Sequence, residues 1–308
     1  MATTIIQPGE IEPPVRKAPW LRLPERETLF ARREERCKAL AKDHPLEKYL
    51  LFMARVARAQ QDALNGYGKA ALPDADRLRL NRRHGMPPLA VQNWRRDASW
   101  QEALRMIIGM VRDAAEPAAA DSLARLLAGG GSAFESMADG LLAGDYAGMD
   151  LAAAPLVGAA LQVYWVHMAT SLDREAFAGS AALTLCPVCA SPPLASIVHN
   201  GGIENGQRYL HCSLCASEWH MVRVKCSNCQ STKDIAYHGI EGDSGAVKAE
   251  TCDECQIYLK IMSMDRDPNI VPTVDDLATL PLDILMDQAG FIRSSFSFFL
   301  IPAEEVPA

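Results

Sequence analysis

The chain has 308 residues, of which 49% are hydrophobic and 22% are charged, and its formal net charge at pH 7 is −7. This composition is typical of a globular protein with a buried core, at a length that holds one large domain or two to three small ones. The acidic balance argues against a protein that coats nucleic acid or an anionic membrane.

Residues 1–20 are broken by prolines and predict an extended arm. From residue 21 the pattern becomes helical, as in the stretch 44–66, where apolar residues recur every three or four positions. Asn65-Gly66 indicates the end of that helix. We therefore expect an all-helical N-terminal domain over residues 21–180, packed as a bundle with short connections.

Two further patterns predict helix starts within this domain. The sequences Ser99-Trp-Gln-Glu102 and Ser132-Ala-Phe-Glu135 each match a capping box, in which the serine and glutamate side chains satisfy free backbone amides of the first turn. The three glycines at 129–131 are expected to separate the second of these helices from its predecessor.

The longest uncharged run of the chain, 151–172, is also expected to be a helix. Its length would allow it to span a bilayer, but it is rich in alanine and interrupted by Pro155, Gln162 and His167. We expect a buried central helix and no insertion into a membrane. The N-terminus has no basic stretch followed by an apolar run, so we expect no signal peptide.

The nine cysteines are unevenly distributed along the chain. Cys37 stands alone in a helical segment and is given no role, whereas the other eight form four C-x-x-C pairs. The first two pairs map onto the last two at an offset of 40 residues, which indicates an internal duplication. The paired residues are Cys186, Cys189, Cys212, Cys215, Cys226, Cys229, Cys252 and Cys255. Without a signal peptide, such pairs favour metal sites in a cytoplasmic protein over disulfides.

Two cysteines three positions apart place both sulfurs on one ion, and a second such turn completes a tetrahedron. We expect sequential pairing, in which the first two turns share one ion and the last two share another. The alternative joins the second turn to the third. Metal binding would supply folding free energy on the order of 10 kcal/mol to each small hairpin. The ligand type alone does not separate zinc from iron.

Three stretches of the C-terminal half carry a family resemblance. "RYLHCSLCASEWHMVRVKCSNC", "KAETCDECQIYLKI" and "DDLATLPLDILM" resemble the formate dehydrogenase accessory protein FdhE family over about residues 183–300. The resemblance implies a cytoplasmic factor that is required for active formate dehydrogenase, binds its catalytic subunit before export, and is not itself an enzyme. It also implies rubredoxin-like iron sites with the eight paired cysteines as ligands.

The chain departs from many such cysteine turns at one position. Glycine commonly follows the second cysteine, because the backbone there favours a positive φ. This sequence has Ala190, Ala216, Gln230 and Gln256 at the four positions. A left-handed conformation would cost about 1 kcal/mol at each. The departure removes no ligand, but it leaves the choice between iron and zinc open.

The expected fold is a multidomain α+β protein. The helical domain is followed by two tandem rubredoxin-like or zinc-ribbon metal modules, at 181–225 and 226–268, because strand-forming stretches alternate there with turns. A short C-terminal segment, 269–308, begins as helix and ends in an aromatic stretch. We expect that stretch to pack on the body, since it would promote aggregation if exposed.

Several residues outside the cysteine pairs are weighed between two interpretations. Trp219, in Glu218-Trp219-His220, is expected to cover the metal; the alternative is a surface for a partner. His211 is expected to donate a hydrogen bond near the site and not to act as a ligand. A group of arginines in 77–97 is either a solvated surface, which we favour, or a contact for an acidic partner. These are Arg77, Arg79, Arg82, Arg83, Arg95 and Arg96.

No phosphate loop, nucleophile elbow or H-E-x-x-H motif is present, so no catalytic or cofactor-binding residue is assigned. The favoured function is an assembly factor that binds an enzyme, and the alternatives are a rubredoxin-like electron carrier and a nucleic-acid-binding zinc ribbon. The last is disfavoured because residues 186–262 contain six Lys and Arg against eight Asp and Glu. Self-association is left open.

Overall fold

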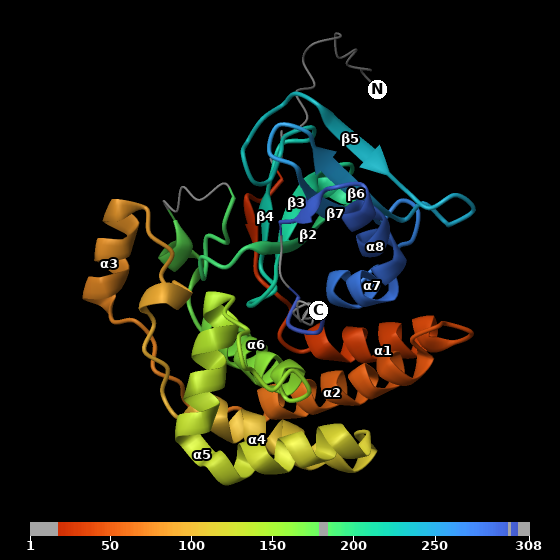
Figure 1. Cartoon of the computed structure of the whole chain (residues 1–308). Coiled ribbons are helices and arrows are strands. Elements are labelled where there is room, and N and C mark those ends of the chain that lie inside the picture. Colours follow the sequence, from red (N-terminus) through yellow and green to blue (C-terminus); the bar gives the residue numbers. More distant parts are fainter. Residues whose placement is uncertain (1–17, 179–183, 295–296, 301–308) are drawn as a thin grey trace, which may run out of the picture.

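The computed structural model describes residues 18–178, 184–294 and 297–300. Helices α1 to α6 form one half of the molecule, and a mixed sheet with helices α7 and α8 forms the other (Figure 1). The predicted α+β organisation, with a helical N-terminal region followed by strands and two four-cysteine clusters, is confirmed. Most of the arm predicted at 1–20 lies outside the described residues.

Six α-helices are described in the N-terminal region. They are α1 (Leu29–Ala41), α2 (Glu47–Asn65), α3 (Ala75–His84), α4 (Ser99–Val111), α5 (Pro117–Ala143) and α6 (Ala154–Thr170). Short 3₁₀ helices lie at Val91–Asn93, Arg112–Ala114, Arg174–Phe177 and Gly202–Glu204. Helix α2 ends where the sequence predicted, because the Gly66 N–H donates to the carbonyl of Asp62 at 3.1 Å and closes its last turn.

Helix α6 occupies the centre of the helical half, as the apolar run predicted. Its residues are buried on all sides, which explains why the run shows no polar face. Its polar Gln162 is also buried and is satisfied on both ends, since it accepts from Arg33 at 2.7 Å and donates to the carbonyl of Ser213 at 2.8 Å. In the part of the chain that the structure describes, no helix combines the length and apolarity needed to cross a membrane.

Gly158 on α6 allows a close approach of the C-terminal aromatic stretch. A Cβ atom at this position would lie 2.6 Å from the Cβ of Phe298, which is buried in the core. Replacing Gly158 with alanine should therefore lower the free energy of unfolding by about 1–3 kcal/mol through overpacking. Urea denaturation measures this change. The matched control is Gly109→Ala on α4, where no atom lies within 4 Å of the added Cβ; an equal loss there would contradict the packing argument.

Neither predicted capping box forms, although both helix starts are close to their predicted positions. The Ser99 hydroxyl donates to Asp97 instead of capping α4, and the Ser132 hydroxyl donates to the carbonyl of Gly129. Helix α5 is broken at Gly130 (φ 63°), so the glycines do separate two helical segments. Glu135 is used elsewhere, because it accepts at 2.7 Å from the indole of the buried Trp100.

A single eight-stranded sheet contains strands from both predicted metal modules, together with strands from the start and the end of the described chain. Its path is β1-β4-β3-β2-β7-β6-β5, with β8 paired to β7. The strands are β1 (Leu21–Arg22), β2 (Pro193–Val198), β3 (Arg208–Cys212), β4 (Glu218–His220), β5 (Ile235–His238), β6 (Val247–Cys252), β7 (Ile257–Ser263) and β8 (Ile292–Arg293). The expectation of an all-helical start is wrong at β1, which pairs with β4.

The two cysteine-rich segments meet through β2 and β7, which pair in parallel over Ser196↔Ile261 to Val198↔Ser263. A buried ion pair reinforces this junction, because Arg208 on β3 donates to Glu250 on β6 at 2.6 Å and both side chains are almost fully enclosed. The two predicted metal modules are therefore parts of one sheet.

The described residues form two hydrophobic cores of unequal size. The larger one joins the helices to the first cysteine segment and includes Phe298 and Phe299, so the expected packing of the aromatic stretch is confirmed for these residues. The smaller core lies between the sheet and α8, and contains Tyr258, Leu282 and Met286.

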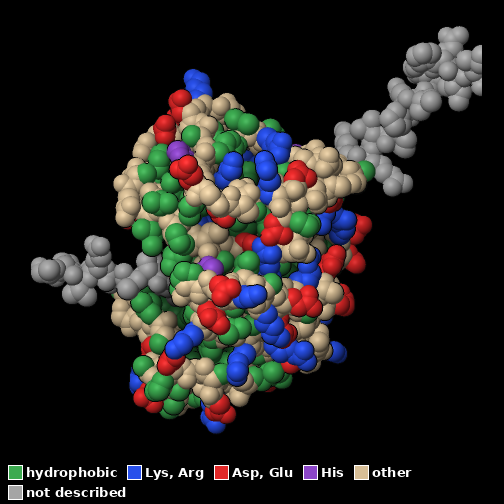
Figure 2. Space-filling model, turned by 90° about the vertical axis from the view of Figure 1, so that its right-hand side faces the viewer, with side chains coloured by type: hydrophobic (Ala, Val, Ile, Leu, Met, Phe, Trp, Pro, Cys, Tyr) green, Lys and Arg blue, Asp and Glu red, His purple; other side chains and the backbone are tan. Residues whose placement is uncertain are grey.

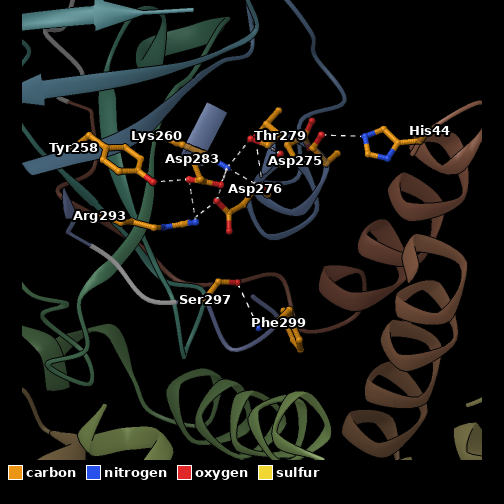
Figure 3. Close-up of polar contacts among 11 residues, drawn as sticks. His44, Tyr258, Lys260, Asp275, Asp276, Thr279, Asp283, Arg293, Ser297 and Phe299 are labelled. Atoms are coloured by element: carbon orange, nitrogen blue, oxygen red, sulfur yellow. Dashed lines mark hydrogen bonds and ion pairs between the residues drawn. The ribbon is translucent and has the colours of Figure 1, made fainter. Parts of the chain in front are cut away.

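Helices α7 (Pro272–Ala278) and α8 (Leu280–Gln288) are held to the sheet by buried charges (Figure 3). Lys260 on β7 lies 2.6 Å from Asp283 and 3.2 Å from Asp276, and Arg293 on β8 contacts both carboxylates. Tyr258 donates to Asp283 at 2.8 Å. Two cations face two anions, so the group is neutral overall although Lys260 and Asp276 are fully buried.

Candidate metal centres

Each predicted group of four cysteines comes together at one end of a strand pair. In the first cluster, Cys186 and Cys189 lie in the turn before β2, and the other two lie where β3 turns into β4. The second cluster repeats this arrangement before β5 and between β6 and β7. The first cluster is Cys186, Cys189, Cys212 and Cys215, and the second is Cys226, Cys229, Cys252 and Cys255.

The grouping follows the sequential pairing that the repeat of 40 residues predicted. Within each cluster the sulfur atoms all lie within 4.8 Å of one another. The second turn (Cys212, Cys215) and the third turn (Cys226, Cys229) belong to different clusters. The alternative in which these two turns share one ion is therefore wrong. The duplication in sequence is therefore a duplication in space.

All four turns use the same backbone geometry. The residue after the second cysteine is left-handed in each, with φ of 60° at Ala190, 55° at Ala216, 65° at Gln230 and 54° at Gln256. In the first turn the Ala190 N–H donates to the carbonyl of Cys186 at 2.8 Å. Glycine is common at this position of such turns, and here four non-glycine residues adopt the left-handed conformation at a cost of about 1 kcal/mol each. An ion bound by the four sulfurs of each cluster would offset that cost.

The sulfur positions fit a tetrahedral ion. Zinc–sulfur bonds of about 2.3 Å place two sulfurs of a tetrahedron about 3.8 Å apart. The Cys189–Cys212 separation is 3.4 Å, and the Cys226–Cys255 separation is 3.7 Å. Backbone amides also point at the sulfurs, as when Leu214 N–H approaches Cys212 Sγ at 3.4 Å. Such contacts stabilise the negative charge of thiolates. A cluster of four thiolates around one ion would keep a net negative charge, so these contacts would also stabilise the metal-bound form.

The two clusters differ sharply in exposure. The four cysteines of the first are buried in the larger core, together with Val188 and Leu214 from the cysteine turns. Burial raises the pKa of the Cys186 thiol, because a lone thiolate is costly in apolar surroundings. In the second cluster Cys229 is exposed and Cys255 is partly exposed. The first ion would be enclosed, whereas the second would lie at the surface.

Glu218 organises two histidines beside the first cluster. His199 lies 2.9 Å from one oxygen of its carboxylate and His211 lies 3.1 Å from the other. Burial alone would raise the pKa of Glu218, but hydrogen bonds from these histidines lower it well below its usual range. His211 thus makes a hydrogen bond near the site through its Nδ1, with Glu218 as the partner, whereas its buried Nε2 has no hydrogen-bond partner among the residues that the structure describes. Trp219 is buried in the core with the first cluster, consistent with the covering role expected for it.

The arginines of 77–97 divide between two environments. Those of α3 are exposed on a solvated helix, whereas Arg96 is half-buried and binds Glu135 at 2.7 Å. Cys37 is a buried helix residue, as expected, and burial raises the pKa of its thiol to about 12. The sequence analysis did not predict the group of buried charges around Lys260. The only sign of it in the sequence is the presence of Asp276 and Asp283 in a mostly apolar helical stretch.

Comparison with known proteins assigns the chain to a family. Models of the FdhE N-terminal, central and C-terminal domains match residues 18–182, 185–223 and 224–300. A protein named FdhE homolog from Edwardsiella ictaluri is 45% identical over 287 residues, which is 92% of both chains. The chain belongs to the FdhE family.

A curated sequence and a crystal structure, both from Pseudomonas aeruginosa, extend the likeness over the FdhE fold. The sequence, named FdhE homolog, is 40% identical over 310 residues, which is 99% of this chain and 100% of its own. The crystal structure of the FdhE protein from the same species aligns with a TM-score of 0.85 at 38% identity, and covers 92% of this chain and 99% of its own. The similarity to FdhE proteins therefore includes the helical half, in which the sequence analysis found no family motif.

Proposed function

We propose that this chain is a cytoplasmic accessory factor for formate dehydrogenase, which binds the catalytic subunit during maturation before export and does not itself catalyse a reaction. Membership of the FdhE family over nearly the whole chain is the observation that carries the proposal. The structure supplies two sulfur clusters on one sheet, which suits a protein that presents a defined surface to another protein.

The eight paired cysteines are proposed as ligands of two ions, iron or zinc, with one ion in each cluster. The donor set and the sulfur separations fit either metal. Bound metal supplies a tetrahedral cross-link between two turns that have little core of their own. Elemental analysis of freshly purified protein should give two ions per chain. A visible absorption band identifies ferric iron, and its absence with two equivalents of zinc identifies zinc.

The test of the function is capture of the client. Tagged protein should enrich the catalytic subunit of formate dehydrogenase from cells that express both, and a strain lacking its own FdhE should regain formate dehydrogenase activity when this chain is supplied. A tagged protein of similar charge from outside the family serves as the control. Failure to enrich the subunit where it is expressed, together with failure to restore activity, would reject the proposal.

One observation supports a second candidate, a rubredoxin-like electron carrier. Cys229 is exposed, so an iron ion in the second cluster would lie within reach of a redox partner. This candidate requires iron, because zinc does not change oxidation state. A colourless protein with two zinc ions would eliminate the electron carrier and leave the accessory factor standing.

A further inference from the structure

The second cluster lies beside β8, which follows α8 as the last strand that the structure describes. Helix α8 is followed by a reversal at Gly290 (φ 86°), after which Phe291 N–H donates to the carbonyl of Met286 at 3.0 Å. The chain then enters β8, where Ile292 N–H donates at 2.9 Å to the carbonyl of Gln256, the residue after Cys255. The α8–β8 segment is therefore in direct contact with the final cysteine turn.

This segment exposes large apolar side chains that its fold does not require. Leu282 and Met286 face the smaller core and anchor α8, whereas Ile284 is 51% exposed and Leu285 is 45% exposed. Ile292 is 70% exposed, the highest value among the large hydrophobic residues described. Figure 2, which shows the right-hand side of the molecule in Figure 1, has hydrophobic side chains toward one margin of this face, with side chains of both charges over the rest. Adjacent exposed apolar residues of this size are typical of contact sites.

The charges around the second cluster are of both signs and sum to a net negative charge once the thiolates are counted. Asp253 and Glu254 lie between its last two cysteines and are exposed, and Asp287 is exposed on α8. Near the other cysteine turn, Arg223 and Lys233 are exposed and Lys225 is partly exposed, and Asp234 offsets one of these positive charges. Four thiolates add a net charge of −2 with a divalent ion or −1 with ferric iron. Apolar side chains and negative charge thus meet at one place.

We propose that this surface docks a segment of the client that carries apolar side chains flanked by Lys or Arg. The surface, called here the cluster 2 face, comprises Cys229, Cys255, Ile284, Leu285 and Ile292 with the acidic residues beside them. The inference rests on the proposed function, since it gives the client its place on the molecule. The apolar side chains supply binding energy, and the negative charges select a basic partner and speed its approach.

The burial of the first cluster explains why the duplicated unit is used in two ways. Its four sulfurs are enclosed by the larger core, so no partner side chain reaches them. The second copy has the same turns but leaves one cysteine exposed. One copy therefore holds the helical half to the sheet, and the other presents a metal-stapled surface to the client.

The experiment measures binding of the catalytic subunit to full-length, metal-loaded protein. The variant Leu285→Ser/Ile292→Ser should bind with a Kd at least about tenfold higher than the unaltered protein. The control Leu72→Ser/Leu80→Ser removes two exposed leucines on or beside α3 and should bind within about twofold. Circular dichroism and metal content of both variants should match the unaltered protein, which shows that they fold.

The charge argument has its own readout. Asp253→Asn/Glu254→Gln should slow association and make the Kd less dependent on salt, because exposed charges act mainly on the encounter rate. The control Asp113→Asn/Asp121→Asn changes two exposed carboxylates near or on α5 and should leave the salt dependence unchanged.

The outcomes separate the inference from the function on which it rests. If the unaltered protein does not bind the catalytic subunit, the proposed function fails. If it binds and the α8–β8 variant binds equally well, the docking site is overturned while the function stands. If that variant instead converts a dimer to a monomer in sedimentation and still binds the subunit, the occupant of the face is a second copy of this chain, which also overturns the proposal.

Discussion

Replacing Cys212 with serine should remove one metal ion per chain and lower the free energy of unfolding by several kcal/mol. Cys212 ends β3 and lies in the larger core, where its sulfur contacts that of Cys189 at 3.4 Å. A structural ion of this kind contributes binding free energy on the order of 10 kcal/mol, part of which becomes folding free energy. Elemental analysis gives the metal content, and urea denaturation followed by tryptophan fluorescence gives the stability of the core.

Two variants separate the metal from the thiol. Cys255→Ser should also release one ion, but with a smaller loss of stability, because that cysteine is partly exposed and outside the larger core. Cys37→Ser changes a buried thiol far in sequence from either cluster and should keep both ions, at a cost of about 1 kcal/mol. Retention of two ions by Cys212→Ser, or loss of the second cluster's ion in its place, would contradict the assignment.

The grouping of the cysteines was predictable because it depends on short spacings and a repeat. Two cysteines three positions apart in a tight turn place their sulfurs close together. The offset of 40 residues then indicates which two turns belong to the same cluster. The left-handed backbone at Ala190 and Gln230 was not predicted by the spacing, because neither residue prefers it and only the structure shows that they adopt it.

Features that depend on distant partners were not predictable in this way. Ser99 has a capping-box neighbour in sequence, but Asp97 takes its hydroxyl, while Glu135 of the other box accepts the indole N–H of Trp100. Strand β1 has only two residues, too few to show alternation, and is defined by its pairing with β4. The different exposure of the two clusters arises because only the first meets the helical half, a fact that two equivalent repeats do not encode.

The same limit applies to the buried charges of the C-terminal region. Asp276 and Asp283 were read as part of a helix, which is correct, but their partners Lys260 and Arg293 come from strands on either side in sequence. A buried acidic residue gives no periodic signal of its own. Only the fold shows that these four side chains neutralise each other, and that α7 and α8 depend on them for their position against the sheet.

Replacing Asp276 with alanine should lower the free energy of unfolding by about 3–5 kcal/mol, because two buried cations would then share a single carboxylate. Lys260 and Asp276 are both fully enclosed, so water does not compensate the lost partner (Figure 3). The control Asp287→Ala removes an exposed carboxylate from α8 and should change stability by no more than about 0.5 kcal/mol. Urea denaturation at pH 7 compares the two.

The pH dependence of the Asp276→Ala variant distinguishes a charge effect from lost packing. Burial alone would raise the pKa of Asp276, but its ion pairs with Lys260 and Arg293 lower it below the usual value of about 3.9. A carboxyl whose pKa is lower in the folded state stabilises the fold above its unfolded pKa and loses that contribution as pH falls through the folded value. The difference between unaltered protein and variant should therefore be full at pH 7 and shrink below about pH 4. A difference that stays constant into acid would show that the carboxylate acts by filling space, and that the charge of Asp276 does not hold α7 to the sheet.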